Sequence, residues 1–295
     1  MSRIHEALKK AEQERLAAGT EISTSPTQVA PPIPAVRPPE MPARDGALTL
    51  EKVMTHCVQA HWHPEPKTAL LLDGNQTHGT EELRTLRSRL YQIRDRQSLQ
   101  TILITSALPA EGKTFLTANL AHMIVRQHER CALIIDADLR RSQLHLALGA
   151  PAAPGLTEYL RGEADELSIM QRGAHDLFFI PGGKAAANPA ELLSNGRMKT
   201  LLERVAPVFD WVLVDSPPAV PVSDASLLAD MCDGVLLVIH AGTTPFDMAQ
   251  KAREEFHNKR LLGVVLNRMA PGETYHSYYY HYYSSAAGKK LKMGG

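Results

Sequence analysis

A phosphate-binding pattern stands in the first half of the chain. Residues 107–114 read Ala-Leu-Pro-Ala-Glu-Gly-Lys-Thr, and they follow the apolar run Ile102–Ile104 and precede a helical pattern. In this order of strand, loop and helix, backbone N–H groups can surround phosphate oxygens. Lys113 would neutralise the β- and γ-phosphates, and the Thr114 hydroxyl would bind Mg²⁺. Ala107 replaces the first glycine of the pattern with another small residue, so a nucleotide and Mg²⁺ site is still predicted.

Three aspartates follow two further apolar runs and can supply carboxylates to a metal ion. Asp136 and Asp138 come directly after Leu133–Ile135, and residues two apart on an extended segment project the same way. An alternative reads Asp138 as a helix N-cap amid surface charge. Asp215, which follows Val212–Val214, argues against it. One lysine and three aspartates around a magnesium-bound triphosphate suffice for phosphoryl transfer, because most of that catalysis is positioning and charge stabilisation.

A single sheet is needed to bring these motifs together. Beyond Gly79, short apolar runs alternate with helical segments, which predicts strands buried on both faces and parallel βαβ crossovers. The fold class is therefore α/β, a doubly wound and mostly parallel sheet that carries a P-loop. Such sheets bind ligands at the carboxyl ends of their strands, where every motif above falls. The predicted strands contain Ile102–Ile104, Leu133–Ile135, Val212–Val214, Val235–Ile239 and Leu262–Leu266.

From about residue 79 to the C-terminus, the sequence resembles the bacterial tyrosine kinases of capsule and exopolysaccharide synthesis. Its most specific element is Asp136-x-Asp138-x-Arg140 after three apolar residues, which in that family is an additional Walker motif close to the P-loop. The resemblance implies a deviant-Walker, partition-ATPase-like P-loop domain that uses ATP to phosphorylate protein tyrosines. It also implies that Asp136 or Asp138 steers Mg²⁺ or accepts the tyrosine proton, and the sequence does not divide these tasks.

The resemblance assigns roles to residues on these motifs. Asn267 closes the last predicted strand, where related P-loop proteins hold the adenine. Catalysis is expected of Lys113, Asp136, Asp138 and Asp215. Metal binding is expected of Thr114, Asp138 and Asp215. Nucleotide binding is expected of Ala110, Glu111, Gly112, Lys113, Thr114, Phe115, Arg140 and Asn267.

A charged helix precedes the first strand. Its segment 81–87 reads Glu-Glu-Leu-Arg-Thr-Leu-Arg, and the family has Glu, Arg and Arg at the positions of Glu81, Arg84 and Arg87. By resemblance this helix joins subunits of a homo-oligomer into a ring. Arg89 stands where the family has an Asn, so the details of that contact differ. The alternative is a solvated helix that its own Glu–Arg pairs stabilise.

Tyrosines are concentrated at the C-terminus, where six of the eight lie within nine residues. The 13 residues from Asn267 to Tyr280, at ~3.3 Å each, can span up to ~40 Å and so reach a neighbouring subunit. We expect autophosphorylation in trans, and each phosphate would add ~1.5 to 2 negative charges, drive the tail out of the site and open the ring. The alternative is an aromatic tail for self-association. The expected phosphorylation sites are Tyr275, Tyr278, Tyr279, Tyr280, Tyr282 and Tyr283.

Composition limits the other functions. Lys plus Arg equals Asp plus Glu at 32 each, so no net charge attracts nucleic acid or an anionic membrane. The sequence has no apolar run of spanning length and no signal peptide, which predicts a cytoplasmic protein. By resemblance, its activator is a membrane chain-length regulator of polysaccharide synthesis that recruits it to the inner face of the membrane. Other protein tyrosines are expected as substrates.

The chain divides into four parts on these patterns. We expect residues 1–18 to form an amphipathic helix suited to docking on a protein, and residues 19–75 to form a proline-rich linker followed by an irregular region. The kinase domain spans residues 76–270, and the tyrosine-rich tail spans residues 271–295. The irregular region contains His56, Cys57, His61 and His63, whose spacing does not suit a zinc site.

Two other functions share the P-loop and the aspartates. Partition-type and division-site ATPases have a signature lysine five positions before the invariant one, and this chain has Leu108 there. A nucleotide-gated adaptor of a polysaccharide export machine would need no catalysis, and its tail would serve as a docking peptide. The tyrosine-rich tail favours the kinase over both alternatives.

Overall fold

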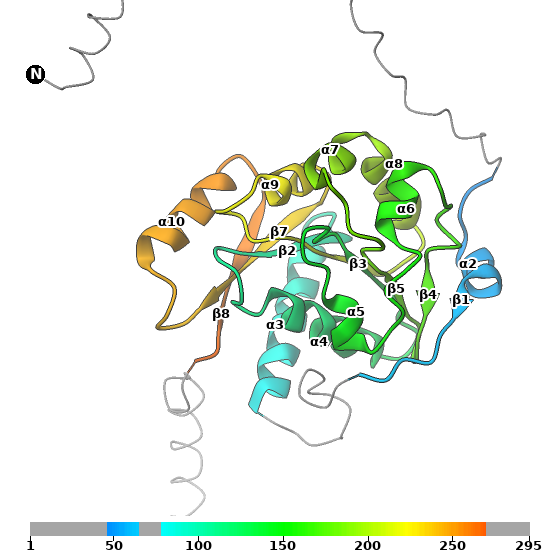
Figure 1. The fold of residues 1–295 in the computed structure, drawn as a ribbon. Helices are drawn as coiled ribbons and strands as arrows, with labels where there is room; N and C mark the ends of the chain where they lie inside the picture. Colours follow the sequence, from blue (N-terminus) through cyan, green and yellow to red (C-terminus); the bar gives the residue numbers. More distant parts are fainter. Residues whose placement is uncertain (1–45, 65–77, 270–295) are drawn as a thin grey trace, which may run out of the picture. The chain divides into compact units, whose positions relative to one another are not determined.

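The computed structural model describes residues 46–64 and 78–269, which form one eight-stranded sheet with helices on both faces (Figure 1). The expected helix at residues 1–18, most of the linker and the tyrosine-rich tail lie outside the described residues. The strands are β1 (Val58–Gln59), β2 (Thr101–Ser106), β3 (Ala132–Asp136), β4 (Gln171–Arg172), β5 (Leu177–Ile180), β6 (Trp211–Asp215), β7 (Gly234–His240) and β8 (Leu261–Asn267). The helices are α2 (Leu50–His56), α3 (His78–Arg94), α4 (Lys113–Val125), α5 (Leu144–Leu148), α6 (Leu156–Arg161), α7 (Pro189–Ser194), α8 (Arg197–Val205), α9 (Asp224–Ala229) and α10 (Phe246–Glu255).

The sheet has the order β1-β4-β5-β3-β6-β2-β7-β8, and every neighbouring pair is parallel except β4 with β5. This confirms the predicted α/β class, and the five predicted strands are β2, β3, β6, β7 and β8. In the register of β3 with β6, Asp136 lies opposite Asp215. The carboxylates of two separate motifs are therefore brought side by side by backbone pairing alone.

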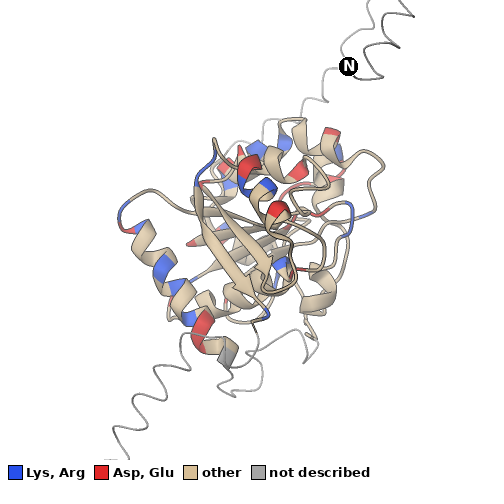
Figure 2. Cartoon of the chain, turned by 90° about the vertical axis from the view of Figure 1, so that its left-hand side faces the viewer, with Lys and Arg blue, Asp and Glu red and all other residues tan. Residues whose placement is uncertain are grey.

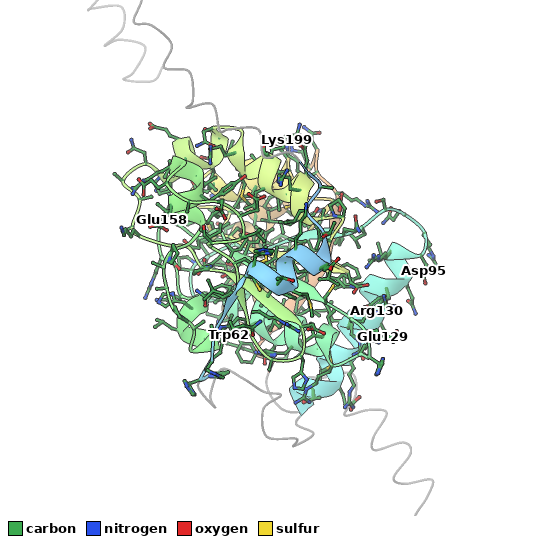
Figure 3. All side chains as sticks on the ribbon, turned by 90° about the vertical axis from the view of Figure 1, so that its right-hand side faces the viewer. Trp62, Asp95, Glu129, Arg130, Glu158 and Lys199 are labelled. Carbon is green, nitrogen blue, oxygen red and sulfur yellow. The ribbon has the colours of Figure 1, made fainter. Side chains whose placement is uncertain are left out.

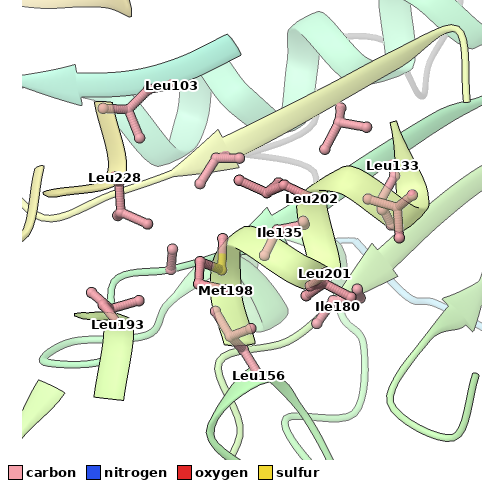
Figure 4. Close-up of a cluster of buried hydrophobic side chains, with 14 of the residues drawn as sticks. Leu103, Leu133, Ile135, Leu156, Ile180, Leu193, Met198, Leu201, Leu202 and Leu228 are labelled. Atoms are coloured by element: carbon pink, nitrogen blue, oxygen red, sulfur yellow. The ribbon is translucent and has the colours of Figure 1, made fainter. Parts of the chain in front are cut away.

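The core has two layers because successive side chains of a buried strand point to opposite faces. On β2, Leu103 packs with helices α6 to α9, whereas Ile102 and Ile104 pack with α3, α4 and α5. Figure 4 shows the first of these layers, in which Leu156, Met198 and other side chains meet the sheet. Continuous burial of β2, β3 and β6 explains why their sequences are apolar without alternation.

Residues 46–64 differ from the expectation of an irregular region up to residue 75. Thr49 caps α2 by accepting a hydrogen bond from the N–H of Lys52 at 3.3 Å, and Val53 is fully buried. The N–H of Val58 then donates to the carbonyl of Met170 at 3.0 Å, and β1 pairs with β4 at the edge of the sheet (Figure 1). A two-residue strand held by backbone pairing is too short to leave a periodic signal.

Acidic and basic residues lie close together along the chain on one side of the molecule. Figure 2 shows acidic and basic residues intermixed on the face that it presents, in keeping with equal numbers of Asp plus Glu and Lys plus Arg. Among the helices that the structure describes, none combines the length and the apolar character needed to cross a bilayer.

Candidate active site

The loop between β2 and α4 has the backbone of a phosphate cradle. Gly112 adopts a left-handed conformation with φ 97°, and Ala110 also has a positive φ of 64°. The carboxylate of Glu111 points inward, where it is 3% exposed and accepts hydrogen bonds from the N–H of Leu108 at 2.9 Å and from the Thr244 hydroxyl. Glu111 therefore stabilises the loop from its inner side, and its side chain does not occupy the outer side of the loop, where backbone N–H groups can bind phosphate.

Asn267, at the end of β8, closes over the same loop. Its Nδ2 donates to the backbone carbonyl of Glu111 at 2.8 Å. A Cβ built on Gly112 would lie 2.1 Å from that nitrogen, so only glycine allows the approach. The last strand of the sheet thus holds the P-loop directly.

Replacing Gly112 by Ala is expected to destabilise the loop, because the methyl group meets Asn267 and the left-handed backbone disfavours any side chain. We expect a loss of about 1 to 3 kcal/mol in the free energy of unfolding and weakened nucleotide binding, measured by urea denaturation and calorimetry.

Gly196→Ala is the matched control for this substitution, since Gly196 has a φ of 83° but no neighbouring atom lies within 4 Å of the point where a Cβ would stand. It carries the backbone strain without the contact. Equal losses of nucleotide binding in the two variants would show that the contact with Asn267 is irrelevant.

Lys113 lies among the carboxylates. Its Nζ donates to Asp138 Oδ2 at 2.9 Å and lies 3.8 Å from Asp215 Oδ2, and its side chain is 11% exposed. Burial alone lowers the pKa of Lys113, but Asp215 and Asp138 outweigh burial, and the net shift is upward. The ammonium group is therefore held charged in a site with little water.

Asp215 holds the start of α4. It accepts the hydroxyl of Thr114 at 2.7 Å and that of Thr117 at 3.4 Å. Burial raises the pKa of Asp215, while Lys113 opposes the rise. Thr114 and Asp215, predicted from separate motifs, thus meet at one point, as a shared metal ligand set requires.

The two aspartates of the Asp136-x-Asp138 motif face different surroundings. Asp136 accepts hydrogen bonds from the Ser142 hydroxyl at 2.7 Å and from the N–H groups of Leu144 at 3.0 Å and Asp138 at 3.2 Å. It therefore orders the loop that leads into α5. Burial, with the charge of Asp215, raises the pKa of Asp136 to about 7.

Asp138 instead points toward the lysine. Besides Lys113, it accepts the N–H of Arg141 at 3.0 Å, and it remains 5% exposed. Arg140 does not join this group, because its Nε and Nη2 donate to the two oxygens of Asp224 at 2.8 and 2.9 Å. The guanidinium group thereby fixes the first turn of α9. Phe115, another residue expected to bind the nucleotide, is half-buried on α4.

The residues of the predicted subunit-joining helix separate into two kinds on α3. Glu81 and Arg84 form an ion pair with 54% and 42% of their side chains exposed. Arg87 instead donates from Nη1 to the carbonyl of Met123 at 2.8 Å, which ties α3 to α4. Of these three residues, Glu81 and Arg84 are the ones exposed enough to meet another molecule.

Sequence reasoning missed several residues of this site. Thr117 lies one helical turn after Thr114, so its spacing was a usable signal. Ser142 and Thr244 carry no local signal, because their partners Asp136 and Glu111 become neighbours only through the fold. The same holds for Asp224, the partner of Arg140.

The donor set suits a hard cation next to phosphate. A threonine hydroxyl and the carboxylates of Asp138 and Asp215 supply the oxygen ligands that Mg²⁺ prefers, beside the loop that precedes α4. The arrangement can position a triphosphate, neutralise its charge with Lys113 and accept a proton from an incoming hydroxyl group.

Comparison with known proteins places the chain among kinases. Tyrosine-protein kinase YwqD of Bacillus subtilis (strain 168) is 36% identical over 192 residues, 64% of this chain and 80% of that protein. Tyrosine-protein kinase ptk of Acinetobacter johnsonii is 39% identical over 160 residues, 54% of this chain but only 22% of that longer protein. No family model matches the chain.

The fold is also similar to that of a tyrosine kinase. The kinase domain of the Escherichia coli tyrosine kinase ETK superposes with a TM-score of 0.65 at 31% identity, over 70% of this chain and 82% of that one. The likeness thus extends from the sequence to the arrangement of the sheet and its helices.

Proposed function

Because this chain belongs to the bacterial tyrosine-protein kinase family, we propose that it transfers the γ-phosphoryl group of ATP to protein tyrosines, including those of its own C-terminal segment. One observation carries this proposal: Lys113, Thr114, Asp138 and Asp215 converge within hydrogen-bond or ion-pair distance beside the P-loop. Capsule and exopolysaccharide synthesis is the setting in which the family acts. The chain spans about a fifth of some relatives, so its own substrates remain part of the proposal.

The residues divide the work as follows in this proposal. Lys113 neutralises the β- and γ-phosphates, and backbone N–H groups of residues 110–115 hold them. Thr114 and Asp215 would hold Mg²⁺, and Asp138 lies close enough to contribute a carboxylate oxygen. When bound, Mg²⁺ supplies positive charge that stabilises the transferring phosphoryl group.

Asp138 is the better candidate to accept the tyrosine proton. The oxygens of Asp136 already accept three hydrogen bonds from its own loop, whereas Asp138 lies beside Lys113 at the site. Asp136 then acts as a positioning residue that keeps Asp138 in place. Asn267 holds the P-loop and lies at the edge where the adenine would bind.

We further propose that the kinase works as a homo-oligomeric ring in which the tail of one subunit enters the site of the next. Glu81 and Arg84, exposed on α3, are the groups that can join subunits, and Arg87 supports them by tying α3 to α4. A membrane chain-length regulator would activate the kinase and hold it at the cytoplasmic side of the membrane, as the family resemblance implies. Phosphorylation would make the tail anionic and release it.

Incubation of the purified full chain with ATP and Mg²⁺ tests the proposal. Mass spectrometry should find phosphate on tyrosines of residues 275–283, and chelation of Mg²⁺ should prevent it. A variant with all six tyrosines changed to Phe should keep its oligomeric mass when ATP is added, whereas the wild-type oligomer should dissociate.

Nucleotide binding without any tyrosine phosphate, even with an activating peptide added in excess, would favour the adaptor function instead. Dissociation of the six-Phe variant in ATP would refute the role of tail phosphorylation in opening the ring.

A further inference from the structure

A cleft of about 640 Å³ lies at the edge of the sheet opposite the P-loop. Three segments line it: residues 59–64, which include the end of β1, the end of α4, and the turn 173–175 that precedes β5. Helix α4 begins at the P-loop and runs back across the sheet, so its last turns lie at the amino-terminal edge of the parallel strands. The volume falls in the range of small-molecule sites.

The lining is rich in groups that can carry positive charge. It contains His61, His63, His122, His175 and Arg126, and within the described part of the chain no Asp or Glu lines it. Burial, followed by the nearby charges of Arg126 and His175, lowers the pKa of His122 to about 4. Imidazole and guanidinium N–H groups are hydrogen-bond donors, so this lining suits an anion better than a cation.

Two buried polar atoms in this lining lack hydrogen-bond partners among the described residues. They are Nε1 of Trp62 and Nε2 of His122. The ring of Trp62, which Figure 3 labels, is packed closely: a Cβ on Gly173 would lie 2.4 Å from it, and Phe179 lies edge-on with the ring centroids 6.1 Å apart. Buried polar atoms without a partner are uncommon in folded proteins and call for an explanation such as a ligand.

The histidines do not form a metal site. Among the residues that the structure describes, no group of three or more His, Cys, Asp or Glu side chains is arranged to hold a metal ion. Four histidines from three segments around an open volume, together with an arginine and an indole N–H, instead offer donors from several directions to one anion.

We propose that this cleft, hereafter the histidine cleft (His61, Trp62, His63, His122, Arg126 and His175), binds a small phosphate monoester. A phosphate carries about 1.5 to 2 negative charges at neutral pH and three acceptor oxygens, which matches several donors better than a single carboxylate does. The remaining volume accommodates the esterified group. This site is separate from the P-loop and does not depend on the kinase activity.

Isothermal titration of the full chain with ribose 5-phosphate and uridine 5′-monophosphate tests this assignment, with saturating ADP and Mg²⁺ present to occupy the P-loop. Both esters should bind more tightly than inorganic phosphate, and the neutral ribose and uridine should not bind. In NMR spectra the ester should raise the pKa of His122 from about 4, because its phosphate faces His122 along with Arg126, His61, His63 and His175.

His122→Leu should weaken ester binding by about tenfold or more, since a charge-assisted hydrogen bond is lost. His175→Asn is a second variant for the case in which His122→Leu does not fold, because Asn tolerates the positive φ of 56° at that position. His257→Leu, just beyond the end of α10, is the matched control and should bind as the wild type does.

Three results would overturn the assignment. They are no binding of either ester, binding of inorganic phosphate as tight as that of the esters, and ester binding that neither His122→Leu nor His175→Asn weakens.

Discussion

Lys113→Met is expected to lower tyrosine phosphorylation of the C-terminal segment by at least about 10²- to 10³-fold, the range measured when one preorganised charge-stabilising group is removed from an active site. Methionine has a similar length but cannot neutralise the phosphates. The ammonium also balances Asp138 and Asp215 at 2.9 and 3.8 Å, so its loss leaves buried carboxylates without a partner. Quantitative mass spectrometry of the tail measures the effect.

Lys199→Met is the matched control, because Lys199 is 67% exposed on α8 and only 3.9 Å from Glu203 across one helical turn. It should phosphorylate its tail at the wild-type rate. Mixing Lys113→Met with wild-type enzyme distinguishes transfer between subunits from transfer within one subunit. Phosphate on the tail of the inactive subunit shows transfer in trans. Undiminished self-phosphorylation by pure Lys113→Met protein would refute the assigned site.

Asp138→Asn is expected to reduce the rate of phosphorylation by about 10²- to 10⁴-fold, the usual contribution of a general base. Its thermal unfolding should change little, since the side chain makes one contact to Lys113 and one to a backbone N–H. Asp247→Asn, in the exposed first turn of α10, serves as the matched control. The steady-state rate with saturating ATP is the measurement.

The companion substitution Asp136→Asn should act on stability. The pKa of Asp136 is raised from its ordinary 3.8 to about 7 by burial and by Asp215, so the folded protein binds this proton more tightly than the unfolded chain does. The stabilisation is full below about pH 4 and is lost as the pH rises through 7, at up to about 1.4 kcal/mol per pH unit.

Urea denaturation of the nucleotide-free protein between pH 4 and 7 should show this slope, and Asp136→Asn should flatten it. If Asp138→Asn stayed active and Asp136→Asn were inactive at unchanged stability, the division of tasks between the two aspartates would be reversed.

The parts of the fold that could be predicted are those with a local sequence pattern, namely the apolar runs of the buried strands and the motifs that follow them. Strands β2, β3 and β6 are buried on both faces, so their sequences are uniformly apolar and easily found. The motifs that follow these strands could be assigned to one site, because the carboxyl ends of parallel strands meet at one edge of the sheet. The sheet order then placed Asp136 opposite Asp215.

What the sequence could not predict depends on partners distant along the chain. Strand β1 is two residues long and exists because Val58 pairs with the segment around Met170. The nucleotide contact expected of Arg140 stays a prediction, and the sequence could not show that Arg140 pairs with Asp224, 84 residues away. The spacing of the motif residues does not predict that Asp136 and Asp138 have different surroundings. It also does not predict that Arg87 ties α3 to α4.

The hold of Asn267 on the P-loop has a consequence for the newborn protein. A ribosome releases the chain from its N-terminus, so the segment 107–114 emerges more than 150 residues before the amide that clasps Glu111, which is 156 positions away. We therefore expect the P-loop of an unfinished polypeptide to be less ordered, and ATP binding to require strand β8. Truncations that stop short of that strand should refold around the inner strands yet fail to retain nucleotide.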